Sequence, residues 1–169
     1  MTCQWQKQCF YEHSVRIPFI VRTPEGPAGH RVAGDVSLVD VLPTLFGITG
    51  LRVEDSLPGR DLSAAIRGED EPSEPVFSEY HTIGMANAGY MGKEGRYKYN
   101  YYVNHDPELY DLASDPEELK DVSGEAEYSS IRRRLNDVLH DWVDPEAIDQ
   151  KAKTDQAKPR FNGSRDTNG

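Results

Sequence analysis

Residues 89–112 read GYMGKEGRYKYNYYVNHDPELYDL, and this stretch decides the fold. It holds three short runs of β-type composition, and a fourth run, Val76–Tyr80, precedes them. Glycines or the turn-forming sequence Asn104–Pro107 separate the three runs, which cover Gly89–Met91, Tyr97–Val103 and Glu108–Leu112. Short β-type runs joined by such turns predict a small antiparallel sheet. The tyrosines of the GRYKYNYY segment alternate along their strand, which favours a packed sheet face over a base-stacking platform.

A cover helix is predicted after this sheet. Residues 125–143 place apolar side chains at the spacing of one helix face, namely Tyr128, Ile131, Leu135, Val138, Leu139 and Trp142. The consecutive arginines Arg132–Arg134 fall mostly on the solvent side of that helix. Residues 71–145 are therefore predicted to form one small subdomain. Residues 146–169 are polar and show no apolar period, so we expect a flexible polar tail there.

The first 70 residues look like the C-terminal remnant of a larger α/β domain. Arg16–Thr23 is apolar and rich in β-formers, which predicts a buried strand. Ser37–Gly50 has helical spacing, with Asp40 as the N-cap, Pro43 in the first turn and Gly50 as the stop. A single strand cannot make a sheet, so this strand and helix need partners that the sequence does not supply.

Composition narrows the functional classes. The chain has 169 residues and a formal net charge of −10, whereas nucleic-acid binding needs a basic face, so no nucleic-acid partner is expected. No stretch approaches the ~18 consecutive apolar residues of a membrane span, so no membrane partner is expected. No secretion signal is visible at residues 1–5, which leaves the compartment open. Cys3 and Cys9 form no C-x-x-C pair, which argues against a zinc site.

Four motifs occur in a defined order. The first, residues 5–18, contains Lys7, then Tyr11-Glu12 and Val15-Arg16-x-Pro18, and it resembles the segment that carries the sulfate-binding lysine of type I sulfatases. The next three resemble the helix, the C-terminal sheet and the exit turn of that family, and they lie at Val36–Leu45, Gly95–Tyr99 and Leu109–Leu112 with Asp115–Glu118. The Phe77–His81 stretch is similar to the choline-sulfatase-like branch.

The resemblance implies a formylglycine-dependent member of the alkaline-phosphatase-like superfamily. The implied fold is α/β, and α+β within this chain: the last strand and helix of an α/β sandwich, then a small antiparallel sheet with a C-terminal helix. Lys7 would be a substrate-binding residue, and a compact lysine charge suits a sulfate oxyanion. His81 ends a strand-like run, where the connecting loop could reach a ligand, so it is the second candidate substrate-binding residue. Calcium or a similar divalent metal, together with formylglycine, is expected in the full-length enzyme, whereas no cofactor, metal ligand or catalytic residue is expected in this chain.

One departure from the family decides what this chain can do alone. The nucleophile motif C/S-x-P-S/A-R is absent, and Ser56–Arg60 matches it only loosely, so we interpret that segment as an ordinary proline turn. The chain is therefore expected to be the C-terminal part of a sulfuric ester hydrolase and inactive alone. Two alternatives stay open: a phosphodiester or phosphonate monoester hydrolase of the same superfamily, and a non-catalytic interaction module. The expected partners are a sulfate-ester small molecule or sugar, the N-terminal sulfatase portion, and a second copy in a homo-oligomer.

Overall fold

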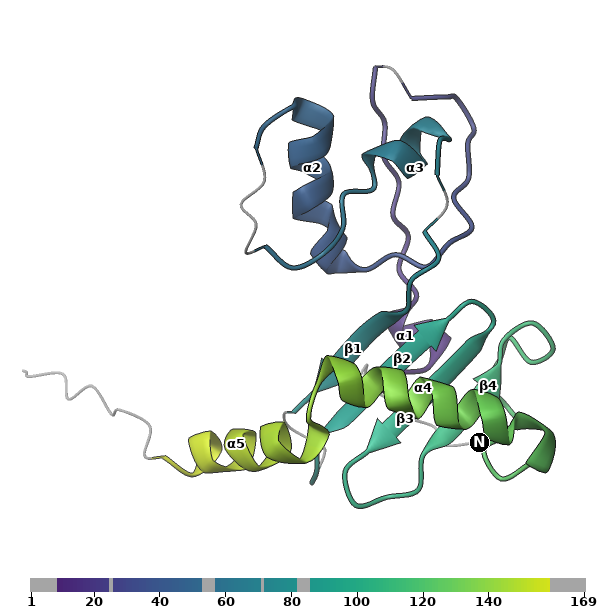
Figure 1. Cartoon of the computed structure of the whole chain (residues 1–169), viewed down its shortest axis with the longest axis vertical. Coiled ribbons are helices and arrows are strands. Elements are labelled where there is room, and N and C mark those ends of the chain that lie inside the picture. The colour runs from purple at the N-terminus through teal and green to yellow at the C-terminus, as the bar shows by residue number, and fades with distance from the viewer. Residues whose placement is uncertain (1–8, 25, 53–56, 71, 82–85, 159–169) are drawn as a thin grey trace, which may run out of the picture.

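The computed structural model describes residues 9–24, 26–52, 57–70, 72–81 and 86–158. Figure 1 shows two parts: a sheet with helix α4 lying across one face, and a smaller part beyond one end of the sheet that contains α2 and α3. No helix within the described ranges is long and apolar enough to cross a membrane. The combination of helices with an antiparallel sheet confirms the α+β prediction.

The sheet is a four-stranded antiparallel meander in the order β1-β2-β3-β4. Its strands are β1 (Val76–Tyr80), β2 (Gly89–Glu94), β3 (Tyr97–Tyr102) and β4 (Glu108–Asp111). Each of these strands was predicted, although β2 extends three residues past the expected end at Met91. Tight turns join the strands because Gly95 adopts a positive φ of 57° and Asn104 one of 63°, the left-handed region that glycine and asparagine tolerate best.

The core lies between the sheet and α4 (Ser129–Trp142), which follows the 3-10 turn η2 (Ala126–Tyr128). Leu135 and Leu139 of α4 are fully buried against the strands, in agreement with the predicted apolar face. Tyr99 of β3 points to the same side and donates a hydrogen bond of 3.0 Å to Asn136 Oδ1. Burial raises the pKa of Tyr99 to about 12. The alternation in β3 therefore sends its odd-numbered tyrosines towards α4 and its even-numbered residues to the other face.

A final helix corrects the expectation of a flexible tail after residue 145. Residues Pro145–Ala157 form α5, and only part of the predicted tail, residues 159–169, lies outside the described ranges. Asp144 caps the helix by accepting a hydrogen bond of 3.0 Å from the Ala147 amide, and Pro145 occupies the first turn. Polar composition suggested disorder, but the Asp-Pro start is a strong helix signal and Asp149 is buried against the sheet subdomain.

The part beyond the sheet contains η1 (Leu38–Asp40), α2 (Val41–Thr49) and α3 (Ser63–Arg67). The predicted helix is confirmed, and Gly50 ends it with a left-handed φ of 68°. The buried strand predicted over residues 16–23 is not formed, which corrects that expectation: the segment has no regular secondary structure, and Ile20 is 90% exposed. The physical reason is that no strand in the described chain pairs with it. The short helix α1 (Glu12–Val15) precedes it.

Candidate functional site

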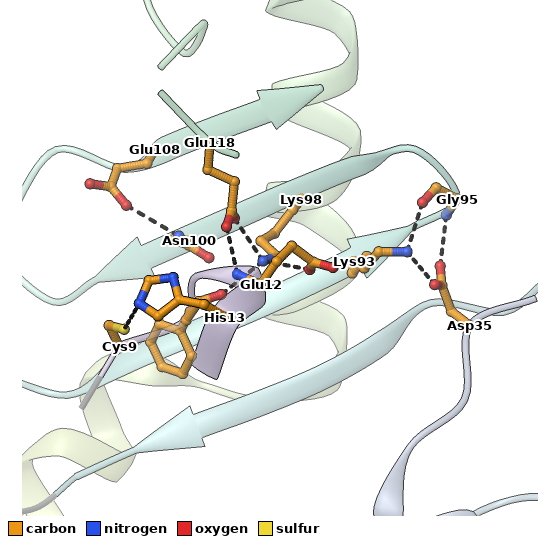
Figure 2. Close-up of polar contacts among 11 residues, drawn as sticks. Cys9, Glu12, His13, Asp35, Lys93, Gly95, Lys98, Asn100, Glu108 and Glu118 are labelled. Carbon is orange, nitrogen blue, oxygen red and sulfur yellow. Dashed lines mark hydrogen bonds and ion pairs between the residues drawn. The ribbon is translucent and has the colours of Figure 1, made fainter. Parts of the chain in front are cut away.

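The segment around α1 lies on the face of the sheet opposite α4, and Figure 2 shows its polar contacts with β3 and with Glu118. Phe10 is 3% exposed, and its ring lies 6.1 Å from that of Tyr102. Tyr11 contacts Tyr110 edge to face at 6.0 Å. These contacts fix the described end of the motif that begins at Trp5, because two successive aromatic side chains pack on neighbouring strands.

Lys98 is the central charged group of this face (Figure 2). Its side chain is completely buried, and its ammonium lies 2.7 Å from Oε1 of both Glu12 and Glu118. It also donates a hydrogen bond of 2.8 Å to the Phe10 carbonyl. A buried ammonium is tolerated only when it is paired and hydrogen-bonded, as it is here. Lys98 therefore holds the α1 segment on the sheet and is occupied by protein carboxylates, which leaves it no role in binding a substrate anion.

Glu118 completes this contact from the turn after β4. Its Oε2 accepts a hydrogen bond of 2.5 Å from the Glu12 amide. Its backbone adopts a positive φ of 55°, which is uncommon for a residue with a Cβ. The turn is the Asp115–Glu118 motif that the sequence singled out. In the structure, this motif brings a carboxylate beneath the α1 segment. Lys98 belongs to the Gly95–Tyr99 motif, so three of the four sequence motifs meet at one ion-pair cluster.

Glu108, the first residue of β4, anchors the same segment. It accepts hydrogen bonds from the side chains of Tyr11, Asn100 and Tyr102, at 3.3, 3.1 and 3.4 Å. Burial raises the pKa of Tyr11 above its ordinary value, and the Glu108 carboxylate adds to the effect. The tyrosine hydroxyls therefore serve as neutral hydrogen-bond donors on this face.

Asp35 joins the α2 part to the sheet (Figure 2). Its carboxylate forms an ion pair with Lys93 and accepts a hydrogen bond of 3.0 Å from the Gly95 amide. Its carbonyl accepts a hydrogen bond of 3.0 Å from the Arg60 guanidinium. One residue thus connects the β2–β3 turn with the loop that precedes α3.

Arg60 forms an ion pair with Asp40, which agrees with the interpretation of Ser56–Arg60 as an ordinary proline turn. Ser56 itself lies outside the described residues. The Arg60 guanidinium lies 3.0 Å from Asp40 Oδ2, and its amide donates to Asp40 Oδ1 at 2.8 Å. Burial alone would raise the pKa of Asp40, but hydrogen bonds from Arg60 and from the Ser37 amide lower it below its usual value. A Cβ on Gly59 would lie 2.2 Å from the Val39 carbonyl oxygen, so the turn requires glycine at that position.

Of the two residues predicted to bind substrate, the structure describes only His81. Lys7 lies outside the described residues. His81 follows β1 and packs its ring edge-on against Tyr90 at 5.3 Å, on the α4 side of the sheet. Its Nε2 lies 3.2 Å from Glu79 Oε2, and its Nδ1 is buried without a hydrogen-bond partner among the described residues. His81 therefore lies on the opposite face of the sheet from Lys98.

His13 is exposed, stacks on Tyr11 at 5.9 Å, and has Nε2 3.9 Å from Cys9 Sγ. Among the residues that the structure describes, no group of three or more histidine, cysteine, aspartate or glutamate side chains could hold a metal ion. The described residues therefore do not fit a calcium site. The sequence analysis did not single out the buried Lys98, although the Gly95–Tyr99 motif contains it.

Two openings flank the segment that follows α1. One, of about 900 Å³, lies between residues of the segments 9–19 and 32–41 and the whole of β1. The other, of about 1140 Å³, is lined by residues of the segments 16–24 and 26–36, by Leu62 and by part of α3. Exposed large apolar side chains line them, namely Ile17, Phe19, Ile20, Val21 and Leu38, and Leu42 and Leu45 of α2 are exposed as well. Exposed apolar side chains gathered in this way are a feature of interaction sites.

Comparison with known proteins gives one family. Residues 3–144 match the family model described as N-sulphoglucosamine sulphohydrolase, C-terminal. The chain is 34% identical over 134 residues to arylsulfatase K of Xenopus laevis, covering 72% of this chain and 25% of that protein. It is 31% identical over 161 residues to Delta 4,5-hexuronate-2-O-sulfatase of Bacteroides thetaiotaomicron, covering 89% and 33%. The chain thus spans a quarter to a third of the length of these curated relatives.

Solved structures agree with this result. The structure of a 2-O GAG sulfatase superposes with a TM-score of 0.57 at 30% identity, covering 72% of this chain and 26% of that one. A phosphonate monoester hydrolase of Agrobacterium radiobacter superposes with a TM-score of 0.51 at 26% identity, covering 60% and 23%. Enzymes named for sulfate and for phosphonate esters thus both contain a part with the fold of this chain.

Proposed function

The chain belongs to the N-sulphoglucosamine sulphohydrolase C-terminal family, and from this membership we propose that it is the C-terminal portion of a hydrolase of sulfuric esters. The observation that carries the proposal is the match over residues 3–144, which includes the segment with Lys7 and the buried cluster that anchors its described end. Two sulfatases are at least 31% identical to the chain. The substrate class is accordingly a sulfate ester of a sugar or another small alcohol.

We propose that Lys7 and His81 contact the substrate. The lysines of β2 and β3 are already paired, Lys93 with Asp35 and Lys98 with two glutamates, so neither offers a free charge to a sulfate group. His81 has a buried nitrogen without a partner among the described residues, and an unsatisfied polar atom of this kind calls for an explanation such as a ligand.

The partner that completes the enzyme is an N-terminal sulfatase portion, which would supply formylglycine and calcium or a similar divalent metal. Such a centre provides the nucleophile and a clamp for the charge that develops on the transferred group. The surface proposed for this portion comprises the apolar segment Ile17–Val21 and the exposed side of α2. Residues 16–23 gain strand partners only if another sheet pairs with them. The alternative is that a second copy of the chain binds this surface and forms a homo-oligomer.

A chimera tests this proposal. The N-terminal two thirds of the Bacteroides thetaiotaomicron Delta 4,5-hexuronate-2-O-sulfatase would be joined to this chain at matching residues. Turnover of an aryl sulfate that exceeds turnover of an aryl phosphonate monoester supports the proposal. The reverse preference favours the second candidate, a phosphonate monoester hydrolase, which the structural likeness to the Agrobacterium enzyme motivates. A well-folded chimera with neither activity contradicts both and leaves the non-catalytic interaction module.

A further inference from the structure

The C-terminal helix α5 contacts both ends of the segment that links β1 to β2. At the first end, Gln156 Nε2 donates a hydrogen bond of 2.7 Å to the carbonyl oxygen of His81. At the second end, Asp149 Oδ1 accepts a hydrogen bond of 2.7 Å from the Ala88 amide, and Lys153 Nζ donates one of 2.7 Å to Asn87 Oδ1. Three side chains of one helix thus hold the residues that flank this connection.

The His81 ring is tied to α5 by a second route. It packs against Tyr90, whose hydroxyl donates a hydrogen bond of 3.2 Å to the Pro145 carbonyl in the first turn of α5. Tyr90 has no exposed surface, so the ring that supports His81 is itself fixed between the sheet and the helix. The backbone of His81 and the surface under its ring therefore depend on the same helix.

The electrostatics of α5 agree with this role. Asp149 is buried, and burial opposes its ionisation, but hydrogen bonds from Lys153 and from the Ala88 amide lower its pKa below the ordinary value. Lys153 lies 2.7 Å from the other carboxylate oxygen of Asp149. The carboxylate is therefore charged at neutral pH, and a charged acceptor makes the stronger hydrogen bond to the Ala88 amide.

The matched family region ends at residue 144, and α5 begins at Pro145. We propose that α5 is a positioning element for His81, with Gln156, Asp149 and Tyr90 as the positioning residues. This inference rests on the proposed function in one respect, namely that the His81 side chain touches the substrate. A segment outside the shared family region thereby sets the position of a specificity residue inside it.

The test uses the full chain and two point variants that leave α5 in place. Gln156→Ala should shift the imidazole NMR signals of His81, because it removes the donor to the His81 carbonyl. Asp149→Ala should speed amide hydrogen exchange at Ala88 by about tenfold or more, a change that corresponds to about 1.4 kcal/mol. The matched control is Gln150→Ala, which removes an exposed glutamine from the same helix. Thermal midpoints are measured for every variant, so that a local effect is separated from a loss of overall stability.

The proposal is overturned if the His81 imidazole shifts are the same in Gln156→Ala as in the control Gln150→Ala. It is also overturned if Asp149→Ala leaves the rate of amide exchange at Ala88 unchanged. If Asp149→Ala unfolds the chain, the NMR spectrum of Gln156→Ala still shows whether α5 positions His81. In the chimera, Gln156→Ala should raise KM with kcat unchanged, as His81→Ala would. If Gln156→Ala shifts the His81 signals but His81→Ala leaves the kinetics of the chimera unchanged, the positioning of His81 by α5 is retained. Only the substrate role of His81 is then refuted.

Discussion

The ammonium of Lys98 lies 2.7 Å from Glu118 Oε1, and at most 1% of either side chain is exposed. The same ammonium reaches Glu12 and the Phe10 carbonyl, so one buried cation joins the turn after β4 to the N-terminal segment. Because both charges are removed from water, each depends on the other for its stability in the folded chain.

Lys98→Met should therefore lower the free energy of unfolding by about 3–5 kcal/mol, since it leaves buried carboxylates without a cation. Urea denaturation measures the change. The control Lys120→Met removes an exposed lysine paired with Glu125 and should cost about 0–1 kcal/mol. Adding Glu118→Gln to Lys98→Met should recover about 0.5–3 kcal/mol, because one uncompensated charge disappears. Equal costs for Lys98→Met and Lys120→Met would contradict the buried pair.

Asp40→Asn should lower the free energy of unfolding at pH 7 by about 1.5–3 kcal/mol, because the Asp40 carboxylate accepts from the Arg60 side chain and from two amides. The folded state lowers the pKa of Asp40 below 3.8, so its contribution is complete above that pH and is lost as the pH falls through the folded value. The difference between wild type and variant should accordingly shrink as the pH falls below about 4. Exposed Asp137→Asn serves as the control, and a difference that is independent of pH would refute the ionic role of Asp40.

Amide hydrogen exchange should be slow in the sheet and in α4 and fast in the segment that follows α1. Amides of residues 97–103 and 131–142 lie in β3 and α4 around the core and should be protected, whereas amides of residues 17–22 lack strand partners and should exchange far faster. Binding of the N-terminal sulfatase portion should slow exchange in residues 17–22. Strong protection of residues 17–22 in the isolated chain would instead indicate a self-sufficient module.

The isolated chain should hydrolyse neither an aryl sulfate nor an aryl phosphate, because its sequence holds no nucleophile motif and its described residues form no metal site. A fluorogenic assay with added calcium checks this result. Turnover that disappears in Ser56→Ala would overturn the prediction and assign the chemistry to Ser56.

In the chimera, Lys7→Ala should lower kcat/KM by about 10²–10³, the usual loss when a contact to a developing oxyanion is removed. His81→Ala should change KM between substrates while kcat on the preferred one is kept. The exposed Lys120 provides a control through Lys120→Ala. Near-normal kcat/KM of Lys7→Ala on every sulfate ester tested would show that Lys7 does not bind the anion.

The sequence predicted the elements whose partners are local. The four strands pair with chain neighbours, and α4 covers the sheet that precedes it, so periodicity and turn residues were sufficient. The prediction of a strand over residues 16–23 was wrong for the described chain, because apolar composition does not reveal whether a pairing strand exists. The helix α5 was missed because its stability comes from a cap and from Asp149, not from an apolar stripe.

The candidate site was predictable only in part. Spacing pointed to the α1 segment and to the Asp115–Glu118 turn, but nothing in the sequence shows that Lys98 joins them. A lysine on a strand is normally solvent-facing, and its burial here follows from carboxylates that are distant in the sequence. Substrate binding by Lys7 and His81 stays a prediction.

The Lys98 cluster also dictates an order of events during synthesis of the chain. The Glu12 amide is separated from its Glu118 acceptor by 106 residues, and the Phe10 carbonyl from Lys98 by 88. At about 5–20 residues per second, the ribosome needs about 5–20 s to make the intervening chain. Throughout that interval, the nascent segment around Phe10 has no β3 on which to settle, and its aromatic side chains are open to chaperones. The segment around Phe10 is therefore locked on the sheet only after the last strands have been made.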